Sequence, residues 1–166
     1  MLRVGTVGTS SIMRTIQEAI RLTDGMECRV VYSRTGEQGR AFAAEMGVPE
    51  HCTDYAAMLE RSDLDLIDIA SPNRFHAEQA LAALEHGKHV ICEKPLSAHA
   101  KDVAELQALA KERGLIYLEA IMFMHLPQRK LLEEALKKIG NIMRNLFANW
   151  QESAYEKYLK DFSLPL

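Results

Sequence analysis

Apolar residues along the chain form short β-prone runs that alternate with longer stretches of helical spacing. The β-prone runs predict strands at 2–7, 28–31, 64–70, 89–92 and 115–118. Between them, apolar positions three or four residues apart predict helices at 12–22, 40–46, 55–59, 76–84 and 98–113. Parallel strands need helical crossovers that cover both faces of the sheet, so the alternation predicts an α/β fold with a doubly wound parallel sheet.

The pattern changes beyond residue 120. A helix is expected from Pro127 to Ile139, and the run from about 141 to 150 predicts a strand that leaves the first domain. This strand carries Leu146, Phe147 and Trp150. Without its own sheet it would expose unpaired backbone groups and apolar surface, so we expect the chain to form homo-oligomers.

The stretch 87–95 ends one of the predicted strands with charged residues. Its apolar run 89–92 fits a buried parallel strand and stops at Glu93 and Lys94, which are followed by Pro95. Proline disfavours helical backbone at the residue before it, so Lys94 leaves the sheet edge in a restricted direction. Ligands of open α/β sheets bind at this edge. The alternative is an ordinary strand end with a solvated Glu–Lys pair.

A tight turn between a strand and a helix is predicted at residues 8–12. A dinucleotide fold needs this order, because the pyrophosphate lies against free N–H groups at the helix N-terminus. The full fingerprint Gly-x-Gly-x-x-Gly reads here as Gly8, Ser10 and Met13, so only its first glycine is present. The alternative is a generic turn with a serine N-cap. The candidate pyrophosphate contacts are Gly8, Thr9, Ser10, Ser11 and Ile12.

Ser33 and Arg34 follow the second predicted strand. A carboxylate there would accept from the 2′-OH of the adenosine ribose of NAD, whereas a hydroxyl with a guanidinium suits a 2′-phosphate. The sequence therefore favours NADP, with NAD as the alternative. A solvated turn arginine is the other interpretation of Arg34.

Ser71, Pro72 and Asn73 follow the third predicted strand, and His76 lies in the first turn of the next helix. These residues could face the nicotinamide of a bound cofactor. A capping asparagine and a partly exposed helical histidine are the alternative.

Composition and charge narrow the classes of partner. The chain has 166 residues and a net charge of −3, which gives no electrostatic reason to expect nucleic acid or an anionic membrane. The N-terminus lacks the apolar stretch of a signal peptide, so we expect a cytoplasmic protein. Cys28, Cys52 and Cys92 are widely spaced without a Cys-x-x-Cys, so no disulfide framework or metal site is expected.

Several of these motifs together resemble one family. The motifs that carry the resemblance follow one another in the order found in that family. They are Gly8, Ser33-Arg34, Ser71-Pro72-Asn73 with His76, the block from Gly87-Lys88-His89-Val90 to Glu93-Lys94-Pro95, and Glu119-Ala120 with Met122. The chain closely resembles the N-terminal half of the glucose-fructose oxidoreductase / inositol dehydrogenase / MocA family of NAD(P)-dependent oxidoreductases.

The resemblance implies a Rossmann dinucleotide-binding domain at 1–120, followed at 121–166 by a connecting helix and the start of a truncated substrate or oligomerisation domain. It implies hydride transfer between nicotinamide and a secondary alcohol or carbonyl of a sugar or polyol, with Lys94 as the catalytic residue. Glu93 and Lys94 would lie beside the reacting carbon. Family members are about twice as long, so a non-catalytic NAD(P)-binding or interaction module is the alternative.

Overall fold

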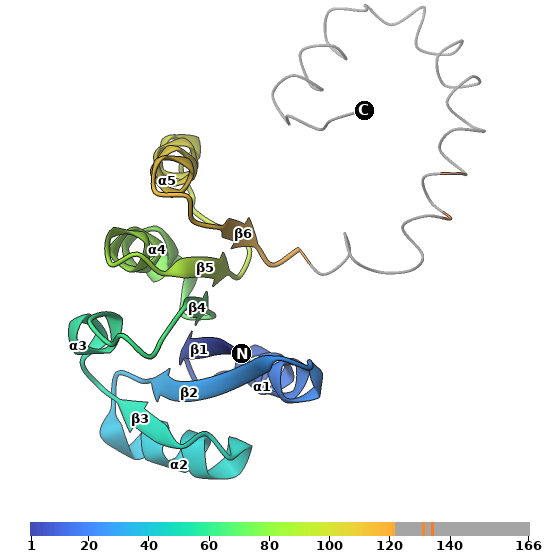
Figure 1. The fold of residues 1–166 in the computed structure, drawn as a ribbon, viewed down its shortest axis with the longest axis vertical. Helices are drawn as coiled ribbons and strands as arrows, with labels where there is room; N and C mark the ends of the chain where they lie inside the picture. The colour runs from blue at the N-terminus through green and yellow to red at the C-terminus, as the bar shows by residue number, and fades with distance from the viewer. Residues whose placement is uncertain (122–130, 132–133, 135–166) are drawn as a thin grey trace, which may run out of the picture. The chain divides into compact units, whose positions relative to one another are not determined.

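Residues 1–121, together with Leu131 and Glu134, are described by the computed structural model. They contain one six-stranded sheet in which every strand pairing is parallel, in the order β3-β2-β1-β4-β5-β6 (Figure 1). The strands are β1 (Leu2–Val7), β2 (Met26–Tyr32), β3 (Glu50–Cys52), β4 (Leu66–Ile69), β5 (His89–Cys92) and β6 (Tyr117–Glu119). The predicted parallel sheet of a Rossmann fold is confirmed.

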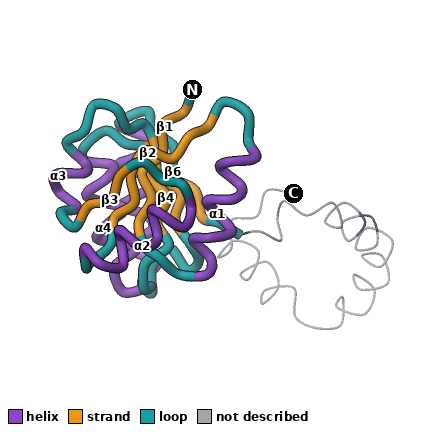
Figure 2. Tube along the Cα trace, turned by 90° about the horizontal axis from the view of Figure 1, so that it is seen from below, coloured by secondary structure: helices purple, strands orange, loops and turns teal. Residues whose placement is uncertain are grey.

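Five α-helices connect these strands within the described residues, and Figure 2 shows the strands between them. The helices are α1 (Ser11–Leu22), α2 (Gly36–Met46), α3 (Tyr55–Leu59), α4 (His76–Glu85) and α5 (Ala100–Glu112), and a 3₁₀ turn, η1 (Asn73–Phe75), precedes α4. The chain builds outward from β1 to β3, crosses back to β4 and then builds outward to β6. The strand order therefore reverses between β1 and β4.

The sheet is buried on both faces by separate apolar clusters. On one face, Met13 of α1 and Phe42 of α2 pack with Val31. On the other, Leu59 of α3, Leu84 of α4 and Leu106 of α5 belong to one larger cluster. Successive residues of a strand point to opposite faces, which is why the strands are continuous apolar runs rather than alternating ones.

The sequence does not predict strand β3. It has only three residues, Glu50–Cys52, and it lies at the edge of the sheet. No alternation or apolar run can be recognised over so short a segment, and its pairing with β2 is a consequence of the tertiary fold. The remaining predicted strands and helices in the described residues are present with boundaries shifted by a few residues.

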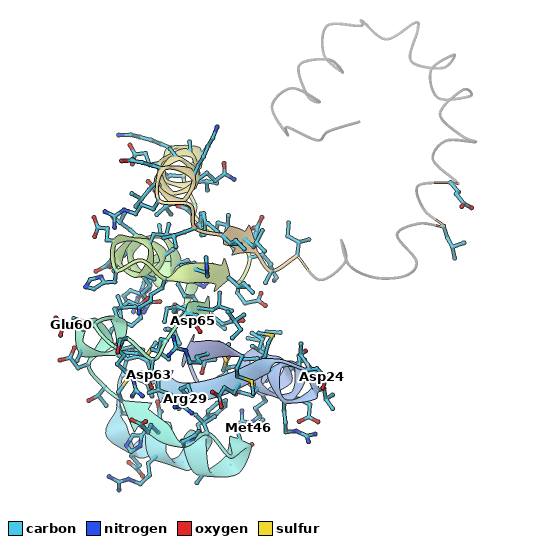
Figure 3. The ribbon with its side chains drawn as sticks, viewed as in Figure 1. Asp24, Arg29, Met46, Glu60, Asp63 and Asp65 are labelled. Atoms are coloured by element: carbon cyan, nitrogen blue, oxygen red, sulfur yellow. The ribbon has the colours of Figure 1, made fainter. Side chains whose placement is uncertain are left out.

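Salt bridges connect the segments around the starts of β3 and β4. Arg61 lies 2.8 Å from Glu50 and 2.8 Å from Asp63, and Arg3 pairs with Asp65 at 2.6 Å. Figure 3 labels Asp63 and Asp65 together with Arg29, whose Nε lies 3.8 Å from Asp63 Oδ2. The Arg61 guanidinium holds the pKa of Asp63 down at about 2. These pairs fix the starts of the strands, opposite to the edge where the predicted site residues lie.

Lys88 belongs to the same region. It is buried, and its Nζ donates to the carbonyl oxygens of Arg61 at 2.6 Å and Leu64 at 3.0 Å. Burial lowers the pKa of this lysine. The first lysine of the 87–95 block therefore holds the α3–β4 loop against the start of β5 and has a structural role.

Three predictions fall outside the described residues, apart from residue 121, Leu131 and Glu134. They are the helix at 127–139, the strand at 141–150 and the domain at 121–166. The compact unit that the structure describes runs from Met1 to Ile121. Among the described residues no helix has the length and apolar character needed to span a bilayer.

Asp68 is a buried acid within the sheet. It lies on β4 between Thr6 of β1 and Ile91 of β5, and only 7% of its surface is exposed. Its Oδ1 has no hydrogen-bond partner in the described part of the chain. Burial, with a smaller contribution from the charge of Glu93, raises the pKa of Asp68 to about 7.

We predict that Asp68 makes the unfolding free energy decrease as pH rises from about 4 to about 7. The unfolded carboxyl loses its proton near its ordinary pKa of 3.8, whereas the folded one keeps it up to about 7, so the native state is progressively less favoured over this interval. Asp68→Asn should remove this part of the slope in urea unfolding at pH values of about 4.5, 6 and 8. Asp24→Asn, at an exposed position, is the matched control, and equal slopes for all three proteins would contradict the prediction.

Candidate active site

A cavity of about 500 Å³ lies at the carboxyl ends of β1, β2 and β4. This is the point at which the strand order reverses, and open α/β sheets bind ligands in the crevice outside such a point. Seven residues predicted from the sequence line it: Gly8, Thr9, Ser10, Ser33, Arg34, Ser71 and Pro72. Three segments far apart in the sequence thus meet in one cavity.

Gly8 allows the β1–α1 turn to lie directly against the end of β4. Its φ is +117°, and a Cβ at this position would lie 2.7 Å from the carbonyl oxygen of Ala70. Any other residue would meet both a strained backbone and a collision with main-chain atoms. The contact between Gly8 and Ala70 therefore joins the ends of β1 and β4 in the wall of the cavity.

The N-terminus of α1 follows this turn. Ser10 occupies the N-cap position, yet its side chain makes no capping hydrogen bond, and the first turn of α1 contains no acidic residue. The free N–H groups and the positive end of the helix dipole favour an anion here. Ser11 and Ile12 begin the helix, but they do not line the cavity.

Met13 explains the absence of the third glycine of the fingerprint. Its side chain is fully buried and belongs to the same cluster as Val31, Phe42 and Ala43. In the fingerprint a glycine at this position lets helix and strand approach closely, whereas here a methionine packs between them. The change affects the packing of α1 and leaves the turn at Gly8 intact.

Ser33 and Arg34 lie at the end of β2. Ser33 is buried, and its backbone N–H donates to the carbonyl oxygen of Cys52 at 3.0 Å. Arg34 is exposed and lines the cavity beside Gln38 of α2. Within the described residues no salt bridge engages Arg34, so its guanidinium is available to an anionic ligand.

Ser71 and Pro72 form the wall beyond β4. The Ser71 hydroxyl donates to Gln79 Oε1 of α4 at 2.6 Å, which fixes the loop on the helix. Asn73 is exposed at the start of η1 and does not line the cavity.

The cavity wall also contains residues that the sequence analysis missed. Tyr32 and Tyr55 form a tilted aromatic pair with ring centroids 5.3 Å apart, and Tyr55 Oη donates to the carbonyl oxygen of Gln79 at 2.8 Å. Both tyrosines line the cavity, as do Phe75 and Gln79. Only the position of Tyr32 next to Ser33 could have indicated its place. Tyr55 comes from the short helix α3, which carries no recognisable motif.

His76 does not line the cavity. The residue is fully buried, and its Nδ1 and Nε2 each lie 2.8 Å from a carbonyl oxygen, those of Pro95 and Ser71 respectively. The structure therefore places this ring between two loops rather than on the surface of the predicted site.

Glu93 and Lys94 follow β5, next to β4. The backbone N–H of Glu93 donates to the carbonyl oxygen of Ile69 at 2.8 Å, which extends the pairing of the two strands. Lys94 is exposed, its backbone N–H donates to Glu93 Oε2 at 3.2 Å, and the Lys94–Pro95 peptide bond is cis. Both residues lie outside the cavity wall at the same edge of the sheet.

No group of three or more histidine, cysteine, aspartate or glutamate side chains that could hold a metal ion is found in the described part of the chain. This edge carries the turn at Gly8 with the N-terminus of α1, the guanidinium of Arg34 and the exposed ammonium group of Lys94. It also carries two carboxyl groups, those of Glu78 in the cavity wall and Glu93 after β5.

The known proteins that this chain is similar to include oxidoreductases and a ketoreductase. Scyllo-inositol 2-dehydrogenase (NADP(+)) IolU of Bacillus subtilis is 35% identical over 144 residues, which are 87% of this chain and 44% of that protein. The oxidoreductase YgjR of Escherichia coli is 37% identical over 161 residues, which are 96% of this chain and 49% of that protein. The crystal structure of KijD10, a 3-ketoreductase from Actinomadura kijaniata in complex with NADP, matches with a TM-score of 0.78 and 34% identity. That match covers 82% of this chain and 44% of the other.

The chain thus spans about half the length of the curated relatives it matches. A family model described as oxidoreductase family, NAD-binding Rossmann fold, matches residues 2–121, a range that includes every residue of the cavity wall. This chain therefore belongs to the glucose-fructose oxidoreductase / inositol dehydrogenase / MocA family of oxidoreductases with an NAD-binding Rossmann fold.

Proposed function

We propose that this chain is the nucleotide-binding half of an NAD(P)-dependent oxidoreductase that transfers a hydride between nicotinamide and a secondary alcohol or carbonyl of a sugar or polyol. The observation that carries the proposal is the cavity at the reversal of strand order, where the Gly8 turn meets the uncapped N-terminus of α1. A dinucleotide fits this arrangement, because its pyrophosphate is an anion and the missing Cβ of Gly8 leaves room for close approach.

With this strand order, the two ends of the dinucleotide would lie on opposite sides of β1. Arg34 and Ser33 at the end of β2 would hold the adenosine ribose, and Thr9 and Ser10 the pyrophosphate. The nicotinamide would then extend over β4 and β5, toward Ser71, Pro72 and Lys94. The bound nicotinamide supplies the hydride chemistry, and the protein residues orient it.

Lys94 is the residue we assign to proton transfer at the substrate oxygen. It is exposed just beyond the carboxyl end of β5, and we expect it to face a substrate held on the nicotinamide. The adjacent Glu93 would help to orient it. An ammonium group can donate to the oxygen of a carbonyl or, once deprotonated, accept the proton of an alcohol.

A non-catalytic NAD(P)-binding or interaction module is the second candidate. The observation that favours it is that the cavity wall is formed by residues suited to the cofactor, whereas Lys94 lies outside this wall. The two candidates agree on the cofactor cavity and differ in whether a substrate is turned over.

We predict that the chain binds NADPH at least about tenfold more tightly than NADH. Hydrogen bonds to charged groups contribute about 1.5 to 3 kcal/mol, and Arg34 in the cavity wall can contact a 2′-phosphate. Arg34→Ala should remove most of this preference, whereas Arg40→Ala, at an exposed arginine of α2 outside the cavity wall, should preserve it. Titrations followed by nicotinamide fluorescence measure both affinities. Equal affinities in the unsubstituted chain would contradict the role of Arg34.

We predict that the 166-residue chain binds cofactor but turns over sugars or polyols very poorly. Positioning of a substrate contributes about 7 to 11 kcal/mol to catalysis and needs the walls of a pocket. A chain extended by a downstream half should be active and should lose about a hundredfold or more with Lys94→Ala. Lys101→Ala, at an exposed position of α5, is the control. Robust activity of the short chain that depends on Lys94 would show the prediction to be wrong.

We also predict self-association through the segment 141–150. Light scattering at increasing concentration should detect oligomers, and Leu146→Lys should shift the population toward monomer because it places a charge on the apolar run. Gln151→Lys, just beyond the segment, is the control for added charge. A monomer at all concentrations would rule out this association.

A further inference from the structure

His76 connects two loops that follow neighbouring strands. It is the first residue of α4, its side chain is fully buried, and its two ring nitrogens each face a backbone carbonyl oxygen. Nδ1 lies 2.8 Å from the oxygen of Pro95, in the loop after β5, and Nε2 lies 2.8 Å from the oxygen of Ser71, in the loop after β4. A carbonyl oxygen can only accept, so a neutral ring, which carries one N–H, donates to one of these two oxygens and packs against the other. A ring protonated on both nitrogens would donate to both.

The two loops have no other backbone pairing beyond the strand ends among the hydrogen bonds of the described residues. The last backbone bond between the two segments is the one from Glu93 N–H to the oxygen of Ile69 at 2.8 Å. Beyond it, the chain after β4 turns into η1 and the chain after β5 continues through Lys94 toward α5. The imidazole thus joins the two segments where the strand pairing has stopped.

The two contacts of the ring are adjacent to residues of the proposed site. Ser71 lines the cavity, and Pro95 directly follows Lys94. An apolar side chain of similar size could fill the buried space, but it could not donate a hydrogen bond to either carbonyl group. The ring thus lies between the cavity wall at Ser71 and the segment that carries Lys94.

We propose that His76 is a positioning residue that fixes Lys94 and the Ser71–Pro72 wall relative to each other, and so orders the nicotinamide end of the cofactor. This inference rests on the proposed function. It differs from direct contact with the cofactor, because His76 has no exposed surface with which to touch a ligand. It also differs from simple core packing, because the proposal confines the effect of His76 to one end of the cavity.

Two ligands separate these roles. By the proposed function, adenosine 2′,5′-bisphosphate would occupy only the adenosine end, at Ser33 and Arg34, whereas NADPH would also reach the β4 and β5 loops. A positioning residue at the second end should affect NADPH alone. A residue needed only for the fold should affect both ligands equally.

The experiment compares three variants of the full 166-residue chain. His76→Phe keeps an aromatic ring and removes its hydrogen bonds. His76→Asn places an amide N–H near the position of Nδ1, toward Pro95, and His76→Gln places one near the position of Nε2, toward Ser71. Circular dichroism and thermal unfolding establish that each variant is folded, and the two amide variants keep the test decisive if His76→Phe does not fold.

We expect His76→Phe to weaken NADPH binding about three- to tenfold and to reduce the fluorescence of the bound nicotinamide, with the bisphosphate affinity unchanged within about twofold. The amide variants should lie between His76→Phe and the unsubstituted chain. Equal losses for both ligands, or no loss for NADPH, would overturn the positioning role. If the unsubstituted chain binds neither ligand, the proposed function itself is wrong, and the inference fails with it.

Discussion

The close approach of the β1–α1 turn to the end of β4 is the constraint on which the site depends. A single atom decides it, because a Cβ on Gly8 would lie 2.7 Å from the carbonyl oxygen of Ala70. With hydrogen in its place, the turn rests on the neighbouring strand and brings the N-terminus of α1 to the cavity. The other two glycines of the fingerprint are absent, yet the tight turn that the first one serves in other dinucleotide folds is retained.

The remaining parts of the site are held by contacts that connect successive loops of the sheet. Gln79 of α4 receives two hydrogen bonds, from the Ser71 hydroxyl to its side chain and from the Tyr55 hydroxyl to its carbonyl oxygen. His76 joins the Ser71 loop to Pro95. A continuous series of contacts therefore runs from α3 to the loop after β5, although each connecting segment is short.

Much of this fold could be predicted from the sequence, because its strands are continuous apolar runs and its helices have helical spacing. Strand β3 could not, since three residues at a sheet edge leave no pattern. The meeting of the Gly8 turn and Arg34 in one cavity could be predicted, because residues at the carboxyl ends of parallel strands lie at one edge of the sheet. The aromatic part of the wall could not, because Tyr55 comes from a five-residue helix without a motif and only the tertiary fold brings it beside Tyr32.

Lys88 and Lys94 lie at opposite ends of β5, so an insertion or deletion within this strand would change the position of one lysine relative to the other. Lys88 is tied by its ammonium group to the oxygens of Arg61 and Leu64 before the strand begins. A parallel strand rises about 3.3 Å per residue, so the four residues of β5 alone span about 10 Å between the two lysines. Insertion or deletion of one residue between the two lysines would reverse the facing of every later side chain of the strand, whereas Lys88 would remain in place. The number of residues between Lys88 and Lys94 is therefore constrained, in addition to their identity.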